Sequence, residues 1–130
     1  EQLKHFEAGG LLDETGRTNY ETLHELQVNA CKVYADNELF GTFQANADGE
    51  GGNFQWMTYR DFDHIVGKTR AVLKSIGVGQ HSKIGIISNN RWEWVALSCA
   101  AHSLNAAIVP MYEAQLPADW TYILNDSGCT

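Results

Sequence analysis

The sequence has few basic residues, and they are not clustered. Nine lysines and arginines stand against sixteen aspartates and glutamates, which gives a formal net charge of −7. A nucleic-acid surface or an anionic membrane patch needs clustered positive charge. We therefore expect no nucleic-acid partner. Acidity alone names no other partner.

Cysteine is also scarce, and the chain lacks the spacings that bind metals. Its three cysteines are Cys31, Cys99 and Cys129, and no C-x-x-C pair occurs. No histidine lies three to five residues from another histidine. Cys99 and His102 share one helical face but have no orienting third group in sequence, so a nucleophilic dyad is not favoured. We predict no metal site and no catalytic residue, and a reducing, cytosolic setting fits.

Long apolar runs are absent. None approaches the roughly 20 residues that span a bilayer, and no signal peptide is recognisable. We therefore expect no transmembrane segment. The chain begins at Glu1 without a methionine and ends at Gly128-Cys129-Thr130, directly after a helical pattern. These ends are those expected of a piece cut from a longer protein.

The patterned part of the chain alternates helices with strands. Residues 1–19 show no sustained period and are expected to form an irregular lead. The segments that follow are predicted in this order: a helix from Thr22 to 36–37, strands Leu39–Phe43 and Phe54–Met57 around a glycine-rich tip, a helix after Thr58 that ends at Gly77, a strand Lys83–Ser88, a helix from Asn90 to Asn105, a strand Ala106–Met111, and a helix from Pro117. The order predicts an α/β fold with parallel βαβ units and an N-terminal β-hairpin.

Four of these segments carry specific expectations about burial. The second helix should bury one apolar stripe. The strand Lys83–Ser88 should be buried on both faces. The third helix is apolar almost all round and should be largely buried. The stripe consists of Phe62, Ile65, Val66, Thr69, Val72, Leu73 and Ile76, and in the last helix Trp120, Ile123 and Leu124 should face inward.

The loop Ser88-Asn89-Asn90-Arg91 follows a strand and precedes a helix, where nucleotide phosphates often bind. It contains no glycine that would let a pyrophosphate approach the backbone, and no G-x-x-x-x-G-K-S/T motif exists. Asn90-x-x-Glu93 is instead a helix start signal. The residues alone therefore indicate a segment without a self-contained site.

The stretch from Gln55 to Ser127 resembles the early part of the long-chain acyl-CoA synthetases, in the adenylate-forming superfamily. The motifs that carry the resemblance are Trp56-Met57-Thr58-Tyr59-Arg60-Asp61, Gly77-Val78-Gly79 with Lys83-Ile84-Gly85-Ile86, Asn89-Asn90-Arg91-Trp92-Glu93-Trp94, and Val109-Pro110-Met111-Tyr112 with Tyr122-Ile123-Leu124-Asn125. They stand in the family's order and spacing. Trp92 replaces the family's usual proline, and Glu113-Ala114-Gln115 replaces the commoner D-T-L.

The resemblance implies a reaction but no catalytic residue in this chain. Such enzymes join a fatty acid to ATP with Mg²⁺, forming an acyl-adenylate, and coenzyme A then displaces AMP. The family's phosphate loop, adenine-binding motifs and catalytic lysine all lie downstream. Residues 20–130 would then be the beginning of the AMP-binding domain, truncated at 130, within a larger adenylate-forming fold and inactive alone.

One site is carried over by position. The turn at Tyr112, Glu113 and Ala114 corresponds to a turn near the coenzyme A channel of related enzymes. The competing interpretation is a structural strand end, where a tyrosine commonly buries its ring and hydrogen-bonds its hydroxyl.

Two other functions remain open. The chain can be a non-catalytic α/β binding or interaction domain, because it lacks a complete site. It can also belong to an adenylate-forming enzyme that activates medium-chain, aryl or amino acids. If the chain belongs to a long-chain acyl-CoA synthetase, the resemblance implies a fatty acid substrate and a parent protein that forms a homodimer. It also implies a location in the cytoplasm or at the periphery of a membrane.

Overall fold

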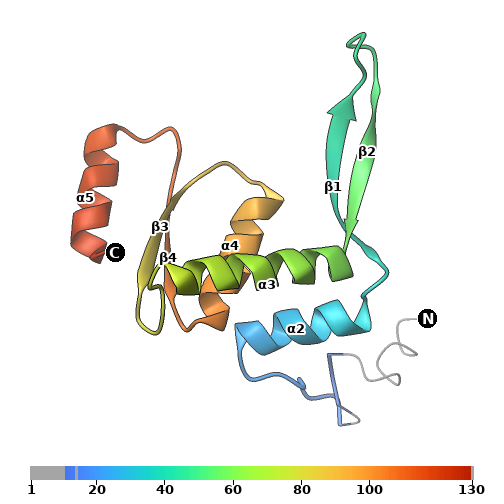
Figure 1. Cartoon of the computed structure of the whole chain (residues 1–130), viewed down its shortest axis with the longest axis horizontal. Coiled ribbons are helices and arrows are strands. Elements are labelled where there is room, and N and C mark those ends of the chain that lie inside the picture. Colours follow the sequence, from blue (N-terminus) through green and yellow to red (C-terminus); the bar gives the residue numbers. More distant parts are fainter. Residues whose placement is uncertain (1–10, 14, 130) are drawn as a thin grey trace. The chain divides into compact units, whose positions relative to one another are not determined.

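The computed structural model describes residues 11–13 and 15–129 (Figure 1). Residues 1–10 of the expected irregular lead lie outside the described residues. The chain divides into two compact units, Glu1–His64 and Ile65–Thr130. Each unit is described by itself.

The first unit opens with a tight turn. Leu12 and Thr18 form an isolated antiparallel bridge. Inside it, Asp13 Oδ1 accepts hydrogen bonds from the Thr15 amide at 2.8 Å and the Arg17 amide at 3.0 Å. The Thr15 hydroxyl, which also donates to this carboxylate, is the main cause of its lowered pKa. In its described part, the lead predicted over residues 1–19 therefore contains a short turn and no helix or strand.

Helix α2 (Leu23–Val33) begins with the predicted capping box. The Thr22 hydroxyl accepts from the Glu25 amide at 3.1 Å, and the Glu25 carboxylate accepts from the Thr22 amide at 3.2 Å. The helix ends at Tyr34, whose amide donates to Ala30 O at 2.9 Å. Cys31 is buried on this helix, and burial raises the pKa of its thiol.

Strands β1 (Glu38–Ala45) and β2 (Gly52–Thr58) form an antiparallel hairpin (Figure 1). The predicted hairpin is confirmed, and both strands extend farther towards the tip than predicted. Cross-strand partners include Gly41 with Trp56 and Phe43 with Phe54.

Helix α3 (Tyr59–Ser75) begins in the first unit and continues into the second. Phe62, Val66 and Leu73 of the predicted stripe are buried, but Val72 and Ile76 are exposed. The prediction is wrong for these two residues. A helix turns by about 100° per residue, so Val72 lies at the edge of a stripe that includes Leu73. Ile76 lies beyond the last helical residue.

A left-handed turn ends α3 as predicted. Gly77 has a φ of 93°. The Gly77 amide donates to Lys74 O at 3.1 Å, and the Val78 amide donates to Leu73 O at 3.0 Å. Glycine suits this conformation because it has no Cβ to clash.

The second unit contains the predicted parallel βαβ unit. Strand β3 (Lys83–Ile87) pairs with β4 (Ala107–Met111), and helix α4 (Trp92–Ser103) connects them. Lys83 lies opposite Ala107, and Ile87 lies opposite Met111. Helix α5 (Pro117–Ser127) follows, with Pro117 in its first turn as predicted.

Burial in this unit follows the prediction in α4 but not in β3. Every residue of α4 is buried or half-buried, as its apolar sequence predicts. In β3, Ile84 and Ile86 are half-buried while Ile87 is exposed. Burial on both faces of a strand requires a covering layer on each side. Within the described residues Ile87 receives no such cover, so the prediction is wrong there.

The inward face of α5 is also less buried than predicted. Trp120 and Ile123 are half-buried, whereas Leu124 is 37% exposed. Leu124 nevertheless contacts the sheet at Gly85, as described below.

Candidate functional site

The carboxyl ends of β3 and β4 lie at the same edge of their sheet. The two strands are parallel, and their last residues, Ile87 and Met111, are paired. The loop at 88–91 and the turn at 112–115 therefore leave the sheet side by side. Ligands of open α/β sheets bind outside the carboxyl ends of the strands. We call these two segments the strand-end site.

The turn of the strand-end site holds the predicted residues Tyr112, Glu113 and Ala114. All three are exposed. Tyr112 directly follows the last residue of β4 and is 69% exposed among the described residues, so its ring is not buried there as the strand-end interpretation expects.

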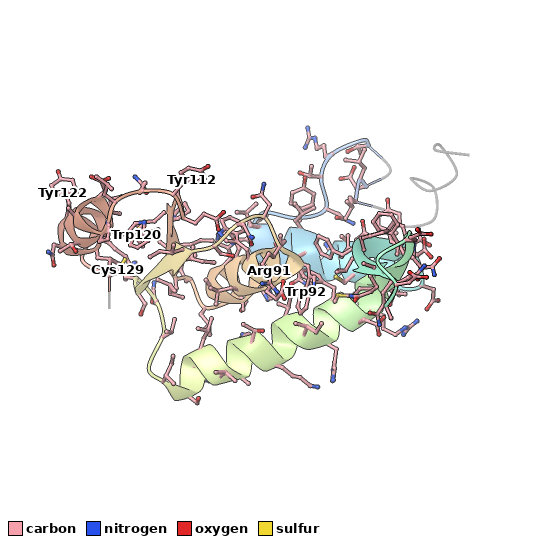
Figure 2. The ribbon with its side chains drawn as sticks, turned by 90° about the horizontal axis from the view of Figure 1, so that it is seen from above. Arg91, Trp92, Tyr112, Trp120, Tyr122 and Cys129 are labelled. Carbon is pink, nitrogen blue, oxygen red and sulfur yellow. The ribbon has the colours of Figure 1, made fainter. Side chains whose placement is uncertain are left out.

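The backbone of Tyr112 is held on both sides. Its amide donates to Gln115 Oε1 at 3.0 Å. Its carbonyl oxygen accepts from the Gln115 amide at 3.2 Å and from Trp120 Nε1 at 2.9 Å. Figure 2 shows Trp120 on the side of α5 towards the sheet and Tyr112 beyond the end of β4. The turn is thus fixed by side chains while the Tyr112 ring points outward.

A close contact with the sheet fixes α5, which carries Trp120. A Cβ added to Gly85 would lie 2.7 Å from Leu124 Cδ2 and 3.1 Å from Met111 Cε. A larger residue at this position would require the ends of the Leu124 and Met111 side chains to shift. In addition, Lys83 Nζ donates to Ser127 O at 2.5 Å. A cation at this carbonyl also suits the negative end of the helix dipole.

The loop of the strand-end site differs from its prediction. Helix α4 is capped by Arg91, not Asn90, and no side chain bonds the first amides. The Arg91 guanidinium grips Glu93 through two hydrogen bonds, Nε to Oε2 at 3.1 Å and a terminal nitrogen to Oε1 at 2.6 Å. The extended backbone of Arg91 lets its side chain reach Glu93 in the first turn, so the helix starts one residue later. The predicted Asn90 cap is therefore wrong.

The Arg91–Glu93 pair sets the electrostatics of this loop. The hydrogen bond from Arg91 lowers the pKa of the Glu93 carboxyl, and the same bond raises the pKa of Arg91. The one cation of the loop is thus already matched by a carboxylate. Among residues 11–13 and 15–129, no group of three histidine, cysteine, aspartate or glutamate side chains is placed to hold a metal ion.

The sequence carries little signal for the residues that position the site. Gln115 stands out only as a departure from a family motif, and Gly85 only as part of one. A signal for Trp120 existed, because a half-buried indole N–H needs an acceptor nearby. The sequence could not say that this acceptor is Tyr112 O.

Comparison with known proteins assigns the chain to a family. The family of AMP-binding enzymes matches residues 30–130. The chain therefore belongs to this family, whose members form adenylates.

Two of the relatives to which the chain is similar are named as acyl-CoA synthetases. The chain is 30% identical over 92 residues to fatty acyl-CoA synthetase B of Dictyostelium discoideum, covering 71% of this chain and 14% of that protein. It is 33% identical over 109 residues to the peroxisomal long chain acyl-CoA synthetase 7 of Arabidopsis thaliana, covering 82% and 15%. The chain thus spans about one seventh of the length of these relatives.

Solved structures confirm the fold. The inhibitor-bound N-terminal domain of FACL13 from Mycobacterium tuberculosis superposes with a TM-score of 0.71 at 18% identity, over 85% of this chain and 26% of that one. The N-terminal subdomain of NpsA from Klebsiella oxytoca, in complex with 3-hydroxybenzoyl-AMSN, gives 0.73 at 15% identity, over 84% and 25%. The α/β architecture is therefore that of the N-terminal part of adenylate-forming enzymes. No described helix is long and apolar enough to cross a membrane.

Proposed function

We propose that this chain forms the beginning of the AMP-binding domain of a long-chain fatty acid–CoA ligase. Residues 20–130 supply the first part of that domain, and residues 1–19 form a lead to it. The observation that carries the proposal is the family match over residues 30–130, together with relatives named as fatty acyl-CoA and long chain acyl-CoA synthetases.

The proposed reaction has two steps. The carboxylate of a long-chain fatty acid attacks ATP, which releases pyrophosphate and leaves an acyl-adenylate. The thiol of coenzyme A then attacks the acyl carbon, and AMP leaves. Mg²⁺ would neutralise the negative charge on the phosphates of ATP. Because no described residues form a metal site, we assign no magnesium ligand and no chemical step to this chain.

The part of the reaction that we assign to this chain is a contact with coenzyme A. The turn at Tyr112, Glu113 and Ala114 presents an exposed ring and an exposed carboxylate. A carboxylate repels the phosphates of coenzyme A, so the turn suits the uncharged pantetheine arm. Gln115 and Trp120 hold the turn in place before the ligand arrives, which lowers the entropy lost on binding.

A KM comparison tests this assignment. In the protein that contains this chain, Tyr112→Ala should raise the KM for coenzyme A about fivefold, because an aromatic contact contributes about 1 kcal/mol. The KM for ATP should not change. Tyr122→Ala is the matched control, since Tyr122 is equally exposed on α5 but lies on the side away from the sheet (Figure 2). Equal effects of the two substitutions, or a shift in the KM for ATP, would refute the contact.

The proposal also includes a homodimer of the parent protein and a cytoplasmic location at the periphery of membranes. Sedimentation of the parent protein checks its stoichiometry. Fractionation of cells into cytosol, membranes and peroxisomes checks its location, and recovery in peroxisomes alone would refute the cytoplasmic assignment.

A further inference from the structure

The β1–β2 hairpin carries an exposed aromatic face that the proposed function does not use. Cross-strand partners lie on the same face of a hairpin. Phe43 pairs with Phe54, and Trp56 follows two residues later on the same face. Their ring centroids lie 5.5 Å apart for Phe43–Phe54 and 5.8 Å apart for Phe54–Trp56. These three residues, each more than half exposed, form what we call the aromatic face.

The opposite face of the hairpin is polar along most of its length. It carries three cross-strand pairs: Thr42 with Gln55 and Gln44 with Asn53 are polar, while Phe40 with Met57, nearest the base, is apolar. The hairpin is thus amphipathic, but its apolar side is left open. A contiguous exposed apolar patch on a folded protein commonly marks an interaction site.

Glycines bring the rings close to the strands. A Cβ at Gly41 would lie 2.8 Å from the Trp56 ring, and a Cβ at Gly52 would lie 2.5 Å from the Phe43 ring. Two of the rings therefore lie flat against the strand opposite, where packing over a glycine supports them. This holds the aromatic face in shape and leaves the outer ring surfaces free for a partner.

The negative charge of the hairpin favours a partner with cationic side chains. From Asn37 to Thr58 the sequence contains the carboxylates Glu38, Asp48 and Glu50 but no lysine, arginine or histidine. The faces of aromatic rings also attract cations. Nucleic acid and anionic membranes are repelled by this charge. A second copy of the hairpin would bring only more carboxylates, so self-pairing is not favoured.

The backbone of the hairpin allows an extended partner. Within the described residues the sheet has two strands, so each strand has an unpaired outer edge. Neither strand contains proline or lysine, the residues that commonly block pairing at an edge. An extended peptide can therefore add to either edge through main-chain hydrogen bonds.

We propose that the hairpin is a docking site for an extended, lysine- or arginine-bearing segment of a partner protein. The segment adds as a third strand. Its alternate basic side chains extend over the aromatic face, and others meet the carboxylates of Asp48 and Glu50 at the tip. This proposal does not depend on the proposed ligase function.

The test uses a labelled synthetic peptide in which lysine alternates with valine, titrated into the protein that contains this chain and followed by fluorescence anisotropy. Saturable binding should weaken as salt is added. A glutamate–valine peptide should not bind. A lysine–proline peptide, which cannot pair as a strand, should bind at least about tenfold more weakly. Equal binding of the lysine–proline peptide would overturn the strand pairing, and no saturation of the lysine–valine peptide below about 1 mM would overturn the proposal.

Variants locate the site. Trp56→Thr should weaken binding about two- to fivefold, because it removes an exposed cation–π contact. The double substitution Asp48→Asn with Glu50→Gln should weaken it about fivefold and reduce the salt dependence. This double variant keeps the proposal testable if Trp56→Thr unfolds the hairpin, since both side chains lie at the exposed tip. Gln55→Thr on the polar face is the control and should bind normally. Binding unchanged in the double variant, or lost equally in Gln55→Thr, would overturn the proposal.

Discussion

Replacing Gly85 by valine should detach α5 from the sheet. The Cβ alone would lie 2.7 Å from Leu124 Cδ2 and 3.1 Å from Met111 Cε, and valine adds two further methyl groups. The ends of Leu124 and Met111 are flexible and can yield partly. They cannot clear three carbons without moving α5, and with it Trp120.

The expected cost follows from two opposing terms. Over-packing of this kind costs about 1–3 kcal/mol. Removing a glycine stabilises the folded state by about 0.5–1 kcal/mol, since the unfolded chain loses freedom. The two ranges leave a net loss of about 0–2.5 kcal/mol, centred near 1 kcal/mol, which at the centre is a fall in Tm of about 4–8 °C. Thermal unfolding followed by circular dichroism measures it.

A local readout and a control make this prediction specific. The indole N–H resonance of Trp120 should shift towards that of a solvated indole in Gly85→Val, because its bond to Tyr112 O would be lost. Gly67→Ala is the matched control, since nothing lies within 4 Å of the Cβ it would add and it lies within α3. It should stabilise the chain by about 0.5–1 kcal/mol. If Gly85→Val is as stable as the wild type, with an unshifted Trp120 signal, the described packing of α5 is wrong.

Three further substitutions test single bonds. Trp120→Phe removes the indole donor and should lower the free energy of unfolding by about 0.5–1.5 kcal/mol, measured in urea. Amide exchange in the turn after Tyr112 should become faster, and unchanged exchange would refute a role of the Trp120–Tyr112 hydrogen bond in holding this turn. Thr22→Ala removes the cap of α2 and should cost about 1 kcal/mol in the same assay, while an equally stable variant would contradict the capping box. The hydrogen bond from the Thr58 hydroxyl lowers the pKa of the Asp61 carboxyl below its ordinary value of 3.8. The ionised Asp61 carboxylate therefore stabilises the folded state fully above pH 3.8, and this stabilisation is lost as the pH falls through the lower pKa of the folded state. Between neutral pH and that lower pKa, the free energy of unfolding of the wild type should fall relative to that of Asp61→Asn. Parallel curves of stability against pH would contradict this hydrogen bond.

Local patterns predicted most of the fold. The apolar run of α4 and the short apolar strands around it were sufficient to predict a parallel βαβ unit, because hydrophobic period and chain order restrict the topology. Capping at Thr22 and the left-handed turn at Gly77 were also predictable, since they depend on residues close in sequence.

The failures lie where contacts between distant residues decide. The exposure of Ile87 depends on which layers cover the sheet. The start of α4 depends on whether Arg91 binds Glu93 or Asn90 caps the helix, and propensity favoured the wrong choice. The hydrogen bond from Trp120 to Tyr112 O connects α5 to the turn after β4, and no signal close in sequence specifies it.

The central claim is that this chain begins a ligase that activates long-chain fatty acids. Its most direct test is to incubate the protein that contains this chain with palmitate, ATP, Mg²⁺ and coenzyme A, and to measure palmitoyl-CoA and AMP by mass spectrometry. We expect both products in equal amounts, with none from residues 1–130 alone. Failure of the whole protein to form palmitoyl-CoA, or formation of an acyl-CoA from benzoate but not palmitate, would contradict it.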